Sequence, residues 1–310
     1  MAPNRSLGRD VHFYDISHPH KPLGGLLLTP SFTERTFFVA LEILIISDSP
    51  YEVYLRGTEM PLSPTEEPLQ PGEYDIKPAS PHGRILITNE SCITRVLSYT
   101  VSSRDELFRR RVRERDSRCV ITGVANPQRL VDADDWSIYH ATHIFPLSAE
   151  QLFIRNGFSW WITNREDEHD TGINSCQNGL LMKADVHALF DNFSISINVD
   201  DDYKIVTFTD DRLNIGNRRL DPVCRDPNNK QSARDELLRW HFRQAVLANM
   251  RGAGEPIFEI DFPPGSDMVG EIMSGPEAAK RMEAELFSRL NGLSLAKGSL
   301  SQCRQDCSDL

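Results

Sequence analysis

Two histidines and an asparagine stand in the order His, Asn, His in the middle of this chain. His143 lies in the segment HATHIFP, Asn178 in CQNGLLM and His187 in KADVHALFD. Cleavage of a phosphodiester bond needs a base that activates water and a metal ion that balances the charge on the phosphate oxygens. Two histidines held together by a strand and a helix could divide these tasks. The spacing alone is weak evidence, because the chain contains nine histidines.

The first histidine lies in a predicted strand. Residues 137–145 have the pattern of a strand that Pro146 ends, since proline cannot continue a hydrogen-bonded ladder. Side chains alternate between the two faces of a strand. We therefore expect His143 to face one side, and His140 and Thr142 to face the other.

The other two residues lie at a predicted turn and in a predicted helix. Asn178 and Gly179 precede an apolar stretch, and the amide could tie the loop that carries His143 to its neighbour; the alternative is a plain turn residue. A helix over residues 184–190 would place His187 and Asp191 on one face. An imidazole beside a carboxylate is a partial shell for a divalent cation, completed by phosphate oxygens and water.

The segments around these residues form a longer series of motifs. An arginine-rich helix pattern runs into RERDSRCVITG, and ATHIFPL, NGLLM, VHALFDNFSISIN and DDYKIVTF follow. This series resembles the HNH endonuclease family, in particular HNH proteins of filamentous fungi, over roughly a third of the chain. The resemblance implies an α+β protein with a ββα-metal (HNH) core.

The resemblance also implies roles for individual residues. His143 would be the general base that takes a proton from the attacking water, and Asn178 would orient it. His187 would be the metal ligand. Asp191 would be a second ligand, a residue that orients His187, or a helix-end residue; of these we favour the orienting role.

One position departs from the family pattern. Many HNH nucleases carry an acidic metal ligand immediately before the first histidine, and Thr142 stands there in this chain. A hydroxyl is a poor substitute for a carboxylate with a hard cation such as magnesium. His140 could stand in as a ligand. Two functions therefore stay open: a metal-dependent endonuclease, and a catalytically inactive HNH fold that serves as a binding or interaction module.

The charge pattern restricts how the chain could hold nucleic acid. A net charge of −11 argues against a surface that grips phosphates everywhere, but residues 104–118 carry seven arginines and four acids. We expect nucleic acid, DNA in the first place, as the partner, with phosphate contacts from Arg110, Arg113 and Lys183. The alternative for each is a solvated side chain, paired with a nearby acid in the case of the arginines.

The cofactor predicted is one divalent cation, magnesium or manganese rather than zinc. The six cysteines contain no CxxC pair, so structural zinc is not predicted. Cys119 and Cys176 are interpreted as small buried residues; the alternative is a hydrolase that uses one of them as a nucleophile. The scattered cysteines, and the absence of a leader pattern or a long apolar run, favour an intracellular protein of the nucleus or cytoplasm without membrane contact.

Composition and turn signals divide the chain into four predicted parts. A helix over residues 37–46, opened by a capping box of Ser31 and Glu34, belongs to the first part; its β-branched isoleucines leave a strand as the alternative. Helices over residues 233–250 and from Pro276 onward belong to the third part, a helical extension over residues 213–295, where a protein partner could bind. The predicted parts are a β-rich module (1–100), the HNH domain (101–212), a helical extension (213–295) and a disordered tail (296–310).

Overall fold

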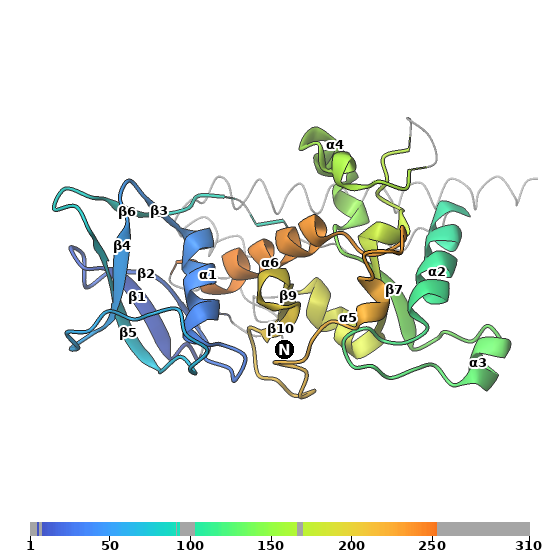
Figure 1. Cartoon of the computed structure of the whole chain (residues 1–310), viewed down its shortest axis with the longest axis horizontal. Coiled ribbons are helices and arrows are strands. Elements are labelled where there is room, and N and C mark those ends of the chain that lie inside the picture. Colours follow the sequence, from blue (N-terminus) through green and yellow to red (C-terminus); the bar gives the residue numbers. More distant parts are fainter. Residues whose placement is uncertain (1–4, 6–7, 91, 94–102, 166–169, 253–310) are drawn as a thin grey trace, which may run out of the picture.

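The computed structural model describes residue 5 and residues 8–90, 92–93, 103–165 and 170–252. Figure 1 shows these residues as two lobes with the long helix α6 running from one into the other. The predicted helix from Pro276, its partner-binding role and the predicted tail lie outside the described residues. The mixture of helices and strands confirms the α+β class.

The first lobe is a small twisted sheet with one helix. Its four-stranded sheet has the order β2-β1-β5-β4, in which β1 and β5 are parallel and the other neighbours are antiparallel. Two short strands, β3 and β6, form a separate antiparallel pair. The elements are β1 (Val11–Asp15), β2 (Pro22–Leu26), α1 (Glu34–Leu44), β3 (Ile45–Ser47), β4 (Tyr51–Leu55), β5 (Gly72–Pro78) and β6 (Ile85–Ile87).

Helix α1 forms where the sequence predicts a helix but ends at Leu44, and the last two residues of the predicted helix belong to strand β3. The predicted capping box was wrong. Thr33 is the N-cap, and its hydroxyl accepts a hydrogen bond from the Thr36 amide at 3.2 Å. Ser31 is buried against the second lobe instead, where its Oγ accepts from the Thr207 amide at 2.9 Å. The serine therefore joins the two lobes and does not cap the helix.

The second lobe is built around the antiparallel hairpin of β7 and β8. In its register His140 lies opposite Met182, and His143 lies opposite Gly179. Helix α5 follows β8 directly, and β9 and β10 form a further antiparallel pair. The elements are α2 (Ser103–Asp116), α3 (Gln128–Asp132), β7 (Tyr139–His143), α4 (Glu150–Arg155), β8 (Gly179–Lys183), α5 (Ala184–Asp191), β9 (Ile195–Asn198) and β10 (Lys204–Thr207).

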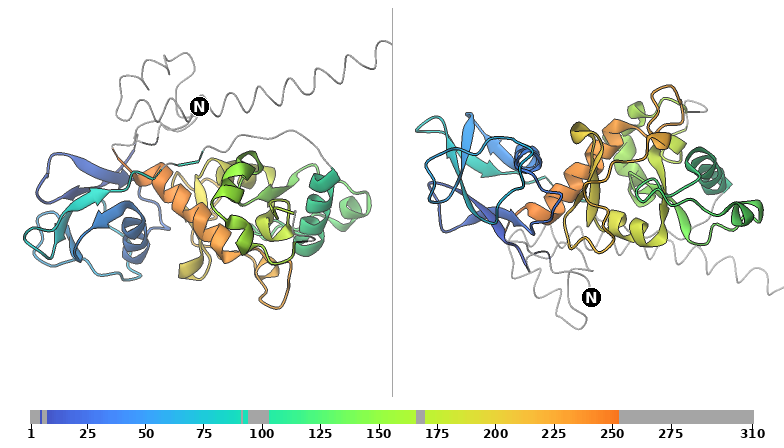
Figure 2. Two further views of the ribbon diagram at one scale, coloured as in Figure 1. Left: turned by 90° about the horizontal axis from the view of Figure 1, so that it is seen from above. Right: turned by 60° about the horizontal axis from the view of Figure 1, so that its bottom comes forward.

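Helix α6 (Asp235–Met250) belongs to the cores of both lobes. Its first turns bury Leu237 and Leu238 in the core around the hairpin, while Phe242 and Val246 are buried with the side chains of the first lobe. Figure 2 shows this helix between the lobes in two further views. None of the described helices combines the length and apolar character that a membrane span requires.

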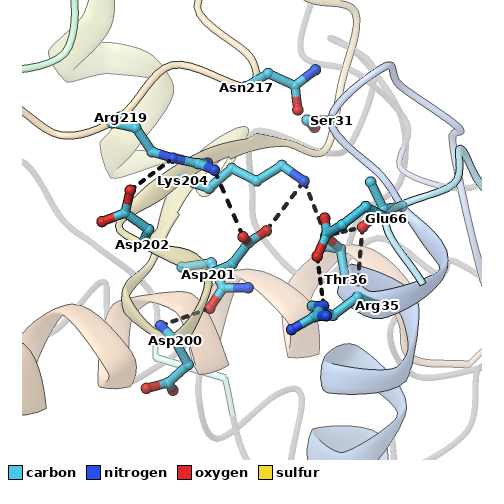
Figure 3. Close-up of polar contacts among 12 residues, drawn as sticks. Ser31, Arg35, Thr36, Glu66, Asp200, Asp201, Asp202, Lys204, Asn217 and Arg219 are labelled. Atoms are coloured by element: carbon cyan, nitrogen blue, oxygen red, sulfur yellow. Dashed lines mark hydrogen bonds and ion pairs between the residues drawn. The ribbon is translucent and has the colours of Figure 1, made fainter. Parts of the chain in front are cut away.

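A cluster of polar side chains lies between α1 and the turn before β10 (Figure 3). Lys204 is 3% exposed; its Nζ lies 3.2 Å from Asp201 Oδ2 and 3.4 Å from Thr36 Oγ1. Arg219 lies 3.8 Å from Asp201 and 3.4 Å from Asp202. A buried ammonium needs such partners because leaving water is costly for a charge. Through Thr36 the cluster joins α1 to the second lobe.

Candidate active site

His143 ends strand β7, and its ring is held from two sides. The imidazole lies flat against Phe108 of α2, with ring centroids 4.0 Å apart and an interplanar angle of 12°. Its Nε2 lies 2.9 Å from Oδ1 of Asn174. Since an amide oxygen only accepts, Nε2 is the donor of this bond, and the neutral ring carries its lone pair on Nδ1.

Asn178 is fully buried and joins the two segments that flank His143. Its Oδ1 accepts from the Phe145 amide at 2.8 Å, and its Nδ2 donates to the carbonyls of Phe145 at 3.1 Å and Ile173 at 2.8 Å. Phe145 follows β7, and Ile173 directly precedes Asn174. The asparagine thereby ties the chain that carries His143 to the loop that carries its hydrogen-bond partner.

His187 and Asp191 pair on one face of α5, with His187 Nε2 2.9 Å from Asp191 Oδ2. On its other side, His187 Nδ1 lies 2.9 Å from Nδ1 of His140, and the two rings meet edge to face. Partial desolvation, and then the neighbouring His187, lower the pKa of His140 below its ordinary value. A lowered pKa favours the neutral ring at neutral pH.

The alternation of strand β7 separates the two histidine environments. His140 contacts α5 through His187, whereas His143 contacts α2 through Phe108. Figure 1 shows β7 between these two helices. Thr142, at the position of the missing acid, is 1% exposed, and its Oγ1 makes a long 3.4 Å bond to the His140 carbonyl.

The three predicted phosphate-binding side chains each lie near a carboxylate. The Nε of Arg110 is 3.9 Å from Glu114, and Lys183 Nζ is 3.3 Å from Asp185. Nη1 of Arg113 is 3.8 Å from an oxygen of Asp134. The pair of Arg110 and Glu114 is exposed, and ion pairs at such positions contribute little and are easily exchanged.

Arg110 and Arg113 lie along an open groove of about 1000 Å³ between α2 and α3. The guanidinium carbon of Arg113 lies 5.3 Å from the ring centroid of Trp136, which also lines the groove. Acidic side chains share the walls: Glu106, Glu114 and Asp134. The groove is of mixed charge, and its arginines all come from α2.

The two cysteines considered as nucleophiles are both fully buried. Burial raises the pKa of Cys176 to about 11. A thiol in this state is protonated at neutral pH and does not attack a substrate. The structure therefore argues against the hydrolase reading based on Cys176.

Sequence reasoning missed several residues that support the site. Phe108, which stacks on His143, and Asn174, which bonds to it, are two of them. A further pair, Arg115 and Asp116, is almost fully buried at the end of α2, with 2.6 Å between Arg115 Nε and Asp116 Oδ1. Arg115 donates to the carbonyls of Cys176 and Gly179 at 2.8 and 2.7 Å, so the pair anchors the start of β8. No spacing rule marks such a contact, because it depends on the tertiary fold.

Two segments of the chain match known protein families. Residues 119–198 match the family model described as HNH endonuclease. Over this segment the chain is similar to the HNH endonuclease family. The segment contains β7, β8, α5 and β9, together with His143, Asn178 and His187. Residues 8–83 of the first lobe match a family described as a domain of unknown function (DUF8573). No curated protein and no solved structure matched the chain.

The HNH domain suggests a nuclease that binds nucleic acid, and HNH nucleases generally use a divalent metal ion. Within the described residues, no group of three or more His, Cys, Asp or Glu side chains is arranged to hold a metal ion. The nitrogens of His140 and His187 that face each other are the donors around which such a site could form.

Proposed function

We propose that the chain is a metal-dependent HNH endonuclease that hydrolyses phosphodiester bonds of nucleic acid, DNA in the first place. The observation that carries this proposal is the HNH match over residues 119–198, with His143 on its hairpin and His187 on the following helix. In this proposal β7, β8 and α5 are the ββα-metal core.

His143 is the general base of the proposed reaction. It accepts at Nδ1 the proton of the water that attacks the phosphorus atom. Its Nε2 hydrogen bond to Asn174 fixes the tautomer, and the amide oxygen stabilises the imidazolium that forms. Stacking on Phe108 fixes the ring plane. Asn178 is a positioning residue, because it acts through the segments on either side of His143.

His187 would hold the divalent cation through Nδ1. Asp191 accepts the hydrogen bond from Nε2 and thereby fixes the ring and raises its basicity as a ligand. When bound, the cation supplies positive charge for the phosphate oxygens. Water and substrate oxygens would complete the shell, which is the reason for expecting magnesium or manganese rather than zinc as the ion that supports cleavage.

Arg110, Arg113 and Lys183 would contact the phosphates that flank the scissile bond. Each would exchange a nearby carboxylate for a phosphate on binding. Binding of this kind weakens as salt concentration rises, because phosphate contacts release counterions.

Cleavage of supercoiled plasmid and of single-stranded DNA tests the proposal, with magnesium, manganese or cobalt present. Wild-type protein should nick the plasmid in a metal-dependent reaction. His143→Ala should lower the rate by about 100-fold or more, as expected when a general base is lost. His187→Ala should also lower it, whereas His82→Ala, an exposed histidine of the first lobe, should not. Metal-dependent cleavage by His143→Ala at the wild-type rate would refute the assignment of the base.

A second candidate is an inactive HNH fold that binds nucleic acid or protein. The observation that favours it is Thr142, which is buried where many HNH nucleases carry an acidic ligand. Folded wild-type protein that retains DNA in a gel-shift assay but cleaves none with any metal would support this candidate. DNA binding that persists in His143→Ala and His187→Ala is expected under both candidates.

A further inference from the structure

His140 has a specific geometry that the proposed cleavage chemistry does not use. Its Nδ1 points at Nδ1 of His187 across the contact between β7 and α5, at 2.9 Å. The residue itself is exposed, so an ion can reach it from solvent. The side chain of His187 is 21% exposed.

The protonation of this histidine pair follows from its neighbours. Asp191 accepts from Nε2 of His187, so Nε2 carries the proton and Nδ1 carries the lone pair of the neutral ring. Without a metal ion, His140 donates from Nδ1 to that lone pair. A tautomer change that moves this proton to Nε2 of His140 would leave a lone pair on each of the two Nδ1 atoms, which lie 2.9 Å apart.

The spacing suits two bonds to one ion. Metal–nitrogen bonds of about 2.1 Å meeting at a right angle hold their nitrogens about 3 Å apart, which is close to the observed separation. A wider tetrahedral angle needs only a small rotation of the exposed His140 ring. The rings meet edge to face, with 90° between their planes.

We propose that His140 and His187 are joint ligands of one transition-metal ion. In this arrangement His140 takes the place of the acidic ligand that many HNH nucleases carry at the position of Thr142. The proposal rests on the proposed function in one respect, the use of His187 as the metal ligand. Imidazole nitrogens favour zinc, nickel or cobalt over magnesium, whose preferred ligands are oxygens. Binding affinity should therefore rank zinc, nickel and cobalt above manganese, and manganese above magnesium, whichever ion best supports cleavage.

Metal binding without substrate tests this ligand pair. Cobalt(II) added to the full-length protein should give a visible absorption band, and titration calorimetry should give the affinities for zinc, manganese and magnesium. His140→Ala and His187→Ala should each weaken zinc and cobalt binding by about tenfold or more. His82→Ala is the matched control and should bind as the wild type does. His140→Asp should narrow the preference for zinc over magnesium, since it replaces a nitrogen ligand by an oxygen ligand.

The results separate this inference from the proposed nuclease function. Wild-type cobalt binding and spectrum in His140→Ala would overturn the inference, even where wild-type protein cleaves DNA. Loss of cobalt binding in both histidine variants would support it, even where no DNA is cleaved. Circular dichroism of each variant shows whether lost binding reflects lost folding, and binding that His140→Asp retains confirms that the ligand position itself is involved.

Discussion

The chemistry expected at His143 depends on one hydrogen bond. The side-chain oxygen of Asn174, 2.9 Å from Nε2, selects the tautomer whose lone pair is on Nδ1. His187 is controlled in the same way by Asp191 at 2.9 Å. The two rings therefore differ in their partner, which is a neutral amide for His143 and a carboxylate for His187.

Replacement of Asn174 should alter cleavage without removing the base. Asn174→Ala should lower the cleavage rate by about tenfold, less than His143→Ala, because the tautomer is no longer fixed. Asn174→Asp should raise the pKa of His143, since a carboxylate favours the imidazolium. The acidic limb of the pH–rate profile should then move to higher pH. A profile unchanged in Asn174→Asp, measured from pH 5 to 9, would exclude this positioning role.

Helix α2 approaches the start of strand β8 closely at Gly179. Gly179 has an extended backbone, so it is not needed for a left-handed turn. A Cβ at this position would lie 2.6 Å from the Phe108 ring and 2.7 Å from Val112. The glycine of the Asn-Gly pair is therefore required by the approach of α2, which also carries the ring that stacks on His143.

Gly179→Ala should both destabilise the domain and impair cleavage. Overpacking of this kind costs about 1–3 kcal/mol, and it would displace Phe108 from His143. Urea denaturation measures the first effect and plasmid nicking the second. The double variant Gly179→Ala, Phe108→Leu is the control; it should recover part of the stability, because it removes the ring atoms that clash. A loss below about 0.5 kcal/mol in the single variant would show that α2 moves freely at this contact.

In the whole molecule, α6 makes the two lobes depend on each other. Its side chains belong to both cores, and Phe193, Val206 and Phe208 of the second lobe are buried with those of the first. Arg9 adds hydrogen bonds to the backbone carbonyls of Asn249 and Gly252 near the end of α6. A lobe separated from α6 would expose a large apolar surface.

Phe242→Ala should therefore destabilise both lobes together. Phe242 is 4% exposed and is buried among side chains of both lobes. Loss of its ring should lower the free energy of unfolding by about 3–5 kcal/mol. All four tryptophans lie in the second lobe, so their fluorescence follows that lobe, while hydrogen exchange of β1 and β5 follows the first. The two transitions should coincide. Met60→Ala, 79% exposed, is the control. Separate transitions, with the first lobe still protected, would show that the lobes fold independently.

The sequence by itself determined the elements whose signals are local. The proline after β7, the spacing of His187 and Asp191 and the apolar face of residues 233–250 predicted a strand, a helical pair and a helix, and the structure contains them. The motif series also predicted the HNH resemblance that the family match confirms. The roles of His143, Asn178, His187 and Asp191, and the boundaries near residues 100, 212 and 295, stay predictions.

Only the tertiary structure decided which groups meet. The pairing of His140 with His187, the stack of Phe108 on His143 and the contact of Asn174 with His143 join segments 31 to 47 residues apart. Ser31 shows the same limit: its sequence context is that of a helix cap, yet its hydroxyl bonds to Thr207. Local propensity favours an element but does not select its partners. Packing selects them, because buried polar groups must find hydrogen bonds wherever the fold supplies them.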